Sequence, residues 1–154
     1  MTAPNHALTG ALIGLSISNP ELALPLAFLS HFVCDAIPHY DPPGKNLEVR
    51  MKYSNRFDHE LVWHFLICVL IIGVLALFQP KNWILAAVCA FMAASPDLFW
   101  IPRYIQVKRT GKDTKLTNPF LRFHSGIQWK TGPKFIWLEA VWFVVFSSLI
   151  ATHL

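Results

Sequence analysis

The chain has 154 residues, of which 54% are hydrophobic and only 14% are charged. Soluble domains usually carry about 25% charged residues, so this composition excludes a disordered chain and a coiled coil and argues against a water-soluble globule. The net charge of +4 would suit a nucleic-acid ligand. The basic residues, however, are concentrated in two loops between apolar segments, which favours a membrane topology signal over nucleic-acid binding.

Five apolar segments follow one another and predict a single all-α integral membrane domain spanning residues 1–154. At about 1.5 Å per residue, a helix of 18 or 19 residues is roughly 27–29 Å long, close to the thickness of the hydrocarbon core. We expect the first two segments to form a hairpin around Ser18-Asn19-Pro20, and we expect long polar loops at 38–58 and 102–134. The five segments are 7–17, 22–37, 61–78, 83–101 and 135–152.

The two long loops hold 12 of the 13 Lys and Arg residues, and only Lys81 lies elsewhere. If the first two helices form a hairpin, both loops and the N-terminus lie on the same side of the membrane. The positive-inside rule makes that side cytoplasmic. We therefore expect a protein of the bacterial inner (plasma) membrane, in contact with membrane lipids and with no nucleic-acid partner.

Ionisable side chains are costly inside a membrane, and here they gather near the ends of helices that point to the cytoplasmic side. His31 and Asp35 are four residues apart and share one helical stripe. Asp97 shares a face with small alanines on the fourth segment. His6, Gly10 and Gly14 form another stripe at four-residue spacing, and we expect these small residues to face a neighbouring helix and to carry His6 inward. Imidazole and carboxylate groups are the usual ligands of zinc, and also of manganese or iron. The alternative for each residue is a satisfied polar contact. The predicted metal ligands are His6, His31, Asp35, His39, Asp97 and His124.

Four further side chains are candidates for a role in chemistry. Glu60 and His64, one turn apart, would serve as general base or would orient a ligand, or they simply pair with each other. Arg103 and Arg122, each close in sequence to a proposed ligand, would bind a phosphate, or they are solvated topology signals.

Short motifs in the chain resemble two groups of metal-dependent hydrolases. Met1-Thr2-Ala3-Pro4-Asn5-His6, Ser95-Pro96-Asp97 and Arg122-Phe123-His124-Ser125 resemble elements of small membrane-bound metal-dependent hydrolases of the YdjM type. The segment from His31 to His39 is similar to the ligand helix of zinc-dependent phospholipase C and the zinc nucleases. The Pro-Asp-x-Asp-His and His-Arg-Gly…Thr-His-Ser elements of the membrane group are not intact here. The resemblance implies a divalent-metal site, with His6, His31, Asp35, Asp97 and His124 as ligands.

These observations predict a metal-dependent hydrolase that acts at the cytoplasmic membrane face on a phosphoester such as a lipid phosphate. Trp100, Tyr104 and Trp129 suit the headgroup region and would place the site within reach of lipids. Two alternatives stay open: a divalent-metal carrier, and a non-catalytic membrane subunit in which buried His and Asp side chains join helices.

Overall fold

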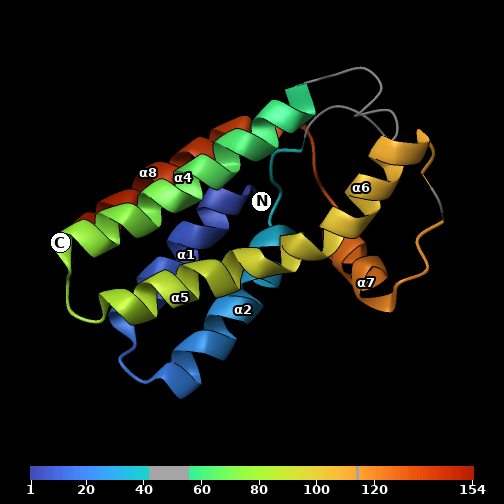
Figure 1. Ribbon diagram of the computed structural model, residues 1–154. Coiled ribbons are helices and arrows are strands. Elements are labelled where there is room, and N and C mark those ends of the chain that lie inside the picture. Colours follow the sequence, from blue (N-terminus) through green and yellow to red (C-terminus); the bar gives the residue numbers. More distant parts are fainter. Residues whose placement is uncertain (42–55, 114) are drawn as a thin grey trace.

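The computed structural model describes residues 1–41, 56–113 and 115–154, and these residues are helical with short connections. Most of the expected polar loop 38–58, with its basic residues Lys45, Arg50 and Lys52, lies outside this part of the chain. The all-α architecture is thereby confirmed for the described residues (Figure 1). The helices are α1 (Ala3–Ser16), α2 (Pro20–Ala36), α4 (Arg56–Phe78), α5 (Trp83–Ala94), η1 (Ser95–Trp100), α6 (Ile101–Thr110), α7 (Pro119–Ile127), η2 (Pro133–Phe135) and α8 (Ile136–Ala151).

Three helical stretches are long and apolar enough to cross a membrane. They run from His59 to Phe78, from Trp83 to Thr110 and from Pro133 to Ala151. Large apolar side chains lie exposed on their outer surfaces, as on Leu70 and Leu77 of α4 and Val144 of α8. A bilayer would cover such surfaces, whereas water would penalise them. The chain is therefore compatible with an integral membrane protein.

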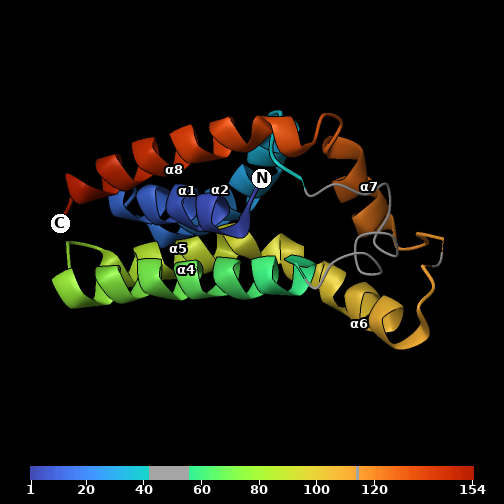
Figure 2. The ribbon, with the colours of Figure 1, turned by 90° about the horizontal axis from the view of Figure 1, so that it is seen from above.

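The predicted bundle of five apolar helices is not confirmed. The first two segments do form helices, but α1 and α2 have 14 and 17 residues and fall short of the three long stretches. Instead, α1 lies inside the molecule, between α8 on one side and the α4–α5 pair on the other (Figure 2). Its side chains are mostly buried, so this helix forms the centre of the core.

Two glycines allow α1 to pack closely against α5. A Cβ on Gly10 would lie 2.2 Å from the carbonyl oxygen of Cys89, and a Cβ on Gly14 would lie 2.5 Å from the Cα of Ala86. Backbones approach this closely only where side chains are absent. The expectation that this small-residue stripe faces a neighbouring helix is confirmed, and the same contact carries His6 of α1 into the interior.

The segment 102–134, expected to be a polar loop, contains two helices. The run that begins at Trp83 continues through η1 into α6 and ends at Gly111, whose φ of 64° and N–H bond to the Val107 carbonyl form a typical helix C-cap. Helix α7 begins after Asn118, whose side chain accepts hydrogen bonds from the N–H groups of Phe120 and Leu121.

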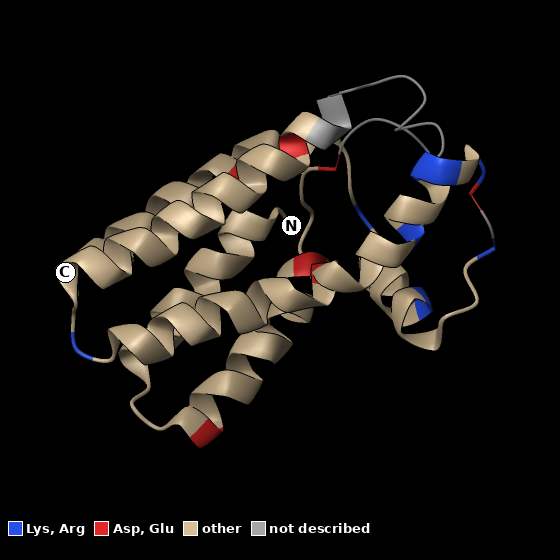
Figure 3. Ribbon diagram, viewed as in Figure 1, with Lys and Arg blue, Asp and Glu red and all other residues tan. Residues whose placement is uncertain are grey.

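Charged side chains of the described residues are unevenly distributed along the bundle (Figure 3). Lys and Arg residues gather on α6, α7 and their connection, at the end of the molecule away from the C-terminus. Lys81 lies at the opposite end, in the turn between α4 and α5. Among the described residues, the molecule thus has a basic end and an end with few basic residues.

Candidate metal centre

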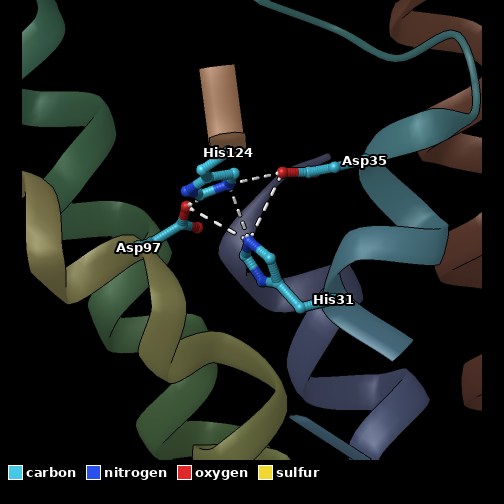
Figure 4. Close-up of side chains that lie close together, drawn as sticks. All are labelled: His31, Asp35, Asp97 and His124. Carbon is cyan, nitrogen blue, oxygen red and sulfur yellow. Dashed lines mark hydrogen bonds and ion pairs between the residues drawn. The ribbon is translucent and has the colours of Figure 1, made fainter. Parts of the chain in front are cut away.

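Four side chains from three separate elements converge at the basic end of the bundle (Figure 4). They are His31 and Asp35 of α2, Asp97 of η1 and His124 of α7, and each offers a donor atom within 4.8 Å of all the others. His124 Nε2 lies 2.8 Å from Asp35 Oδ2 and 2.9 Å from His31 Nε2. Asp97 Oδ1 lies 3.7 Å from His31 Nε2 and 3.9 Å from His124 Nε2. This group could hold a metal ion.

The spacing of the donors suits a single ion. For metal–ligand bonds of about 2.0–2.2 Å, the donors of a tetrahedral zinc site lie roughly 3.3–3.6 Å apart. The distances between His31, Asp35, Asp97 and His124 scatter on both sides of this value. Two neutral imidazoles and two carboxylates also form an electrically neutral site with a divalent cation. The donor set therefore fits zinc, and mixed His/Asp sets of this kind also hold manganese or iron.

The backbone near the junction of α5 and η1 orients His31. Pro96 has no N–H and therefore cannot donate a hydrogen bond to the Ala93 carbonyl three residues before it. His31 Nδ1 lies 2.8 Å from this carbonyl. Because a carbonyl only accepts, Nδ1 must carry the proton, which leaves a lone pair on Nε2 directed at the other donors.

The hydrogen bonds of His124 favour the tautomer with the proton on Nε2, in contrast to His31, whose proton is on Nδ1. The indole N–H of Trp100 donates to His124 Nδ1 at 3.2 Å, so a neutral His124 carries its proton on Nε2. That proton faces Asp35 Oδ2. A metal ion at Nε2 would displace the proton, and Nδ1 would then have to hold it against the Trp100 N–H. The Trp100 bond therefore opposes metal binding at His124.

Asp35 is the centre of the polar network and is 1% exposed. Its Oδ1 accepts hydrogen bonds from the Met1 amino group and from His6 Nε2. Its Oδ2 accepts from His124 Nε2 and from the side-chain amide of Gln128, both at 2.8 Å. A carboxylate without such partners would cost several kcal/mol to bury.

Asp97 differs from the other three donors because 35% of its side chain is exposed. It lies on the wall of a cavity of about 1300 Å³, whereas His31, Asp35 and His124 are fully buried. Three donors of the site are therefore buried in the protein, whereas Asp97 lies on the side from which a small molecule or water can approach.

The other two predicted ligands, His6 and His39, lie beside this group and not within it. The ring of His6 stacks on His31, with centroids 3.9 Å apart, and its Nε2 is 3.1 Å from Asp35 Oδ1. His6 Nδ1 has no hydrogen-bond partner among the described residues. His39 Nε2 is 4.0 Å from Asp35 Oδ1. Burial lowers the pKa of His39, which favours the neutral ring that binds metals.

Three of the four residues predicted to act as a base or to bind phosphate line the cavity. Glu60, His64 and Arg103 line the same cavity as Asp97, and Glu60 Oε1 accepts a bond from the Tyr40 hydroxyl at 3.3 Å. Arg103 pairs with Asp113 at 2.6 Å and stacks over Trp100. Arg122 is exposed on α7 and is not part of the cavity wall.

Glu139 of α8 has a structural role that sequence reasoning missed. Its buried carboxylate accepts hydrogen bonds from the backbone N–H and hydroxyl of Thr2, from the Asn5 amide and from the backbone N–H of Tyr40. These bonds hold the start of α1 and the segment after His39 against α8. The hydrogen bonds of Gln128 to Asp35 and of Trp100 to His124 were also missed. The sequence offered one indication of the role of Glu139, namely its position inside an apolar segment, because a buried carboxylate needs hydrogen-bond donors.

Comparisons of the chain with protein-family models, with curated proteins and with solved structures found no match. The function proposed for this chain therefore depends on the geometry of the site.

Proposed function

We propose that this chain is a membrane-embedded, metal-dependent hydrolase that cleaves a phosphoester at the basic end of the bundle, on the cytoplasmic face. The observation that supports it most strongly is the group of His31, Asp35, Asp97 and His124, which has the donor types and spacing of one divalent-metal site beside a large cavity. When bound, a divalent ion would lower the pKa of a water molecule and stabilise charge on phosphoryl oxygens.

The residues of the chain would divide the remaining work. In hydrolysis, the oxygen of water forms a bond to phosphorus, the ester P–O bond breaks, and the leaving oxygen takes up a proton to depart as an alcohol. Glu60 or His64, both on the cavity wall, would accept the proton from water. Arg103, held by Asp113 and Trp100, would orient the phosphate.

A specific observation also favours a second candidate, a non-catalytic membrane subunit. Asp35 has hydrogen-bond partners within the protein for both of its oxygens, and the Trp100 bond sets a His124 tautomer that donates to Asp35. In this case the polar cluster joins α1, α2 and α7 and has no chemical role. The metal content of the protein separates the two candidates.

The test uses the full chain, purified in detergent without added metal or chelator. We expect about one equivalent of a divalent transition metal, zinc first, together with hydrolysis of a chromogenic phosphoester that a chelator abolishes. Asp35→Asn retains the shape but removes the charge, and we expect metal occupancy and turnover to fall at least tenfold. Glu21→Gln, at the exposed start of the same helix, is the matched control and should change neither.

Two outcomes would contradict the proposal. Protein that contains no metal, and that Asp35→Asn makes less stable to thermal unfolding, would favour the non-catalytic subunit. Metal-loaded protein that transports the ion into liposomes and hydrolyses no phosphoester would favour a carrier, although a carrier usually binds its ion near the midplane of the bilayer.

A further inference from the structure

The cavity beside the metal centre changes in character along its length. At one end its wall contains Asp97, Glu60, His64 and Arg103. Away from this end, the wall consists of apolar side chains of α4 and α5. At about 1300 Å³ it exceeds the roughly 300–1,000 Å³ of pockets for small ligands, so it has room for a ligand much larger than a free phosphate or a nucleoside.

Both helices present a continuous apolar stripe to this cavity. On α4, Leu61, Phe65, Val69 and Ile72 recur every three or four residues and form one face of the helix. On the neighbouring run, the lining residues Ala90, Ala94, Leu98 and Ile101 follow the same spacing. The small alanines leave the volume of the groove open between the two helices, which diverge from their common turn (Figure 1).

The dimensions of the groove match one leaflet of a bilayer. From Glu60 to Ile72 the helix rises roughly 18 Å at about 1.5 Å per residue. Half of a hydrocarbon core of about 30 Å is roughly 15 Å. If α4 and the run from Trp83 cross the membrane, as their length and composition allow, the apolar part of the groove would lie at the depth of lipid chains and the candidate metal centre at headgroup depth.

We infer that the groove between α4 and α5 binds the hydrocarbon chain of a lipid phosphate and so places the phosphate beside Asp97. This inference deepens the proposed function, because it specifies the substrate as a long-chain lipid phosphate. A second copy of the chain or another apolar helix would fill the apolar part, but it would bring no anion to the polar end. An amphipathic lipid phosphate complements both parts of the cavity, because its chain fits the apolar wall and Arg103 on the polar wall is a partner for its phosphate.

The test measures binding and does not require turnover. Radiolabelled hexadecyl phosphate is bound to the detergent-solubilised full chain, and butyl phosphate and hexadecanol serve as competitors. We expect hexadecyl phosphate to bind at least tenfold more tightly than either competitor. Val69→Trp, which fills the groove, should weaken its binding at least tenfold and leave butyl phosphate unaffected. Leu70→Trp is the matched control, since the adjacent side chain is also exposed but does not line the cavity.

A second pair of variants separates a loss of binding from a loss of folding. Ala94→Phe blocks the groove from α5, and Val88→Phe places the same side chain on an exposed position outside the cavity. Hexadecanol that binds as tightly as hexadecyl phosphate, or groove variants that bind hexadecyl phosphate like the wild type, would overturn the inference. Loss of binding in the groove variants, in a protein that proves to contain no metal and hydrolyse nothing, would contradict the proposed function and leave this binding site established.

Discussion

At the scale of single residues, the hydrogen bond between Trp100 and His124 sets which ring nitrogen of His124 carries the proton. Removal of the indole N–H in Trp100→Phe would allow the proton to sit on Nδ1 and would free Nε2 for a metal. We expect metal to bind about two- to tenfold more tightly, which corresponds to one hydrogen bond of about 0.5–1.5 kcal/mol. Competition with a chelator of known affinity measures the change.

The control for this prediction is Trp142→Phe. Trp142 also donates a hydrogen bond from its indole N–H, but to Thr9 of α1, and neither residue belongs to the metal group. Its substitution should leave the metal affinity unchanged. Equal affinity in Trp100→Phe and the wild type would mean that His124 does not bind the ion through Nε2.

The pair of His31 and Asp35 was predictable because residues four apart on a helix share a face whatever the rest of the fold does. Their contact with His124 was not predictable in geometry, since 89 residues separate Asp35 from His124 and only the folded chain sets the distance. The roles of Ala93, Trp100 and Gln128 depend on the same folding. Helical spacing also could not show that Glu60 and His64 line a cavity and lie outside the donor group.

At the scale of elements, the close contact between α1 and α5 depends on the absence of a side chain at Gly14. Gly14→Ala would place a Cβ against the backbone of Ala86 and force the two helices apart. We expect a loss of about 1–3 kcal/mol of stability or more. Gly73→Ala is the control, because a Cβ there meets nothing within 4 Å and alanine favours a helix by about 1 kcal/mol.

Thermal unfolding in detergent, followed by circular dichroism, measures both changes. Gly14→Ala should lower the midpoint, and Gly73→Ala should leave it unchanged or raise it. If both variants unfold at the same temperature, the α1–α5 contact does not limit stability.

The contrast between α1 and α7 shows what sequence patterns reveal about elements. The stripe of Gly10 and Gly14 indicated a close helix contact, and the structure confirms it. Helix α7 was missed although Asn118 followed by Pro119 is typical of a helix start. A nine-residue helix with basic neighbours does not stand out as an apolar run, and α6 was missed for the same reason.

At the scale of the whole molecule, the uneven distribution of charge predicts the orientation in the membrane. Lys112 lies beyond α6 at the basic end, and Lys81 lies in the turn at the other end. We expect a membrane-impermeant maleimide to label Lys81→Cys in intact cells and to label Lys112→Cys only after permeabilisation. The wild type supplies the background from its own three cysteines. Labelling of Lys112→Cys in intact cells would contradict the topology.

The donors of the metal centre come from α2, η1 and α7, and Glu139 of α8 ties the first residues and Tyr40 into place. During synthesis, His31 and Asp35 therefore emerge from the ribosome early, and His124 emerges only after most of the chain has been made. The four donors are complete once α7 has emerged, and the Glu139 anchor is added with α8. An ion that needs all four donors would therefore be bound only late in synthesis, and a chain truncated before α7 would lack His124.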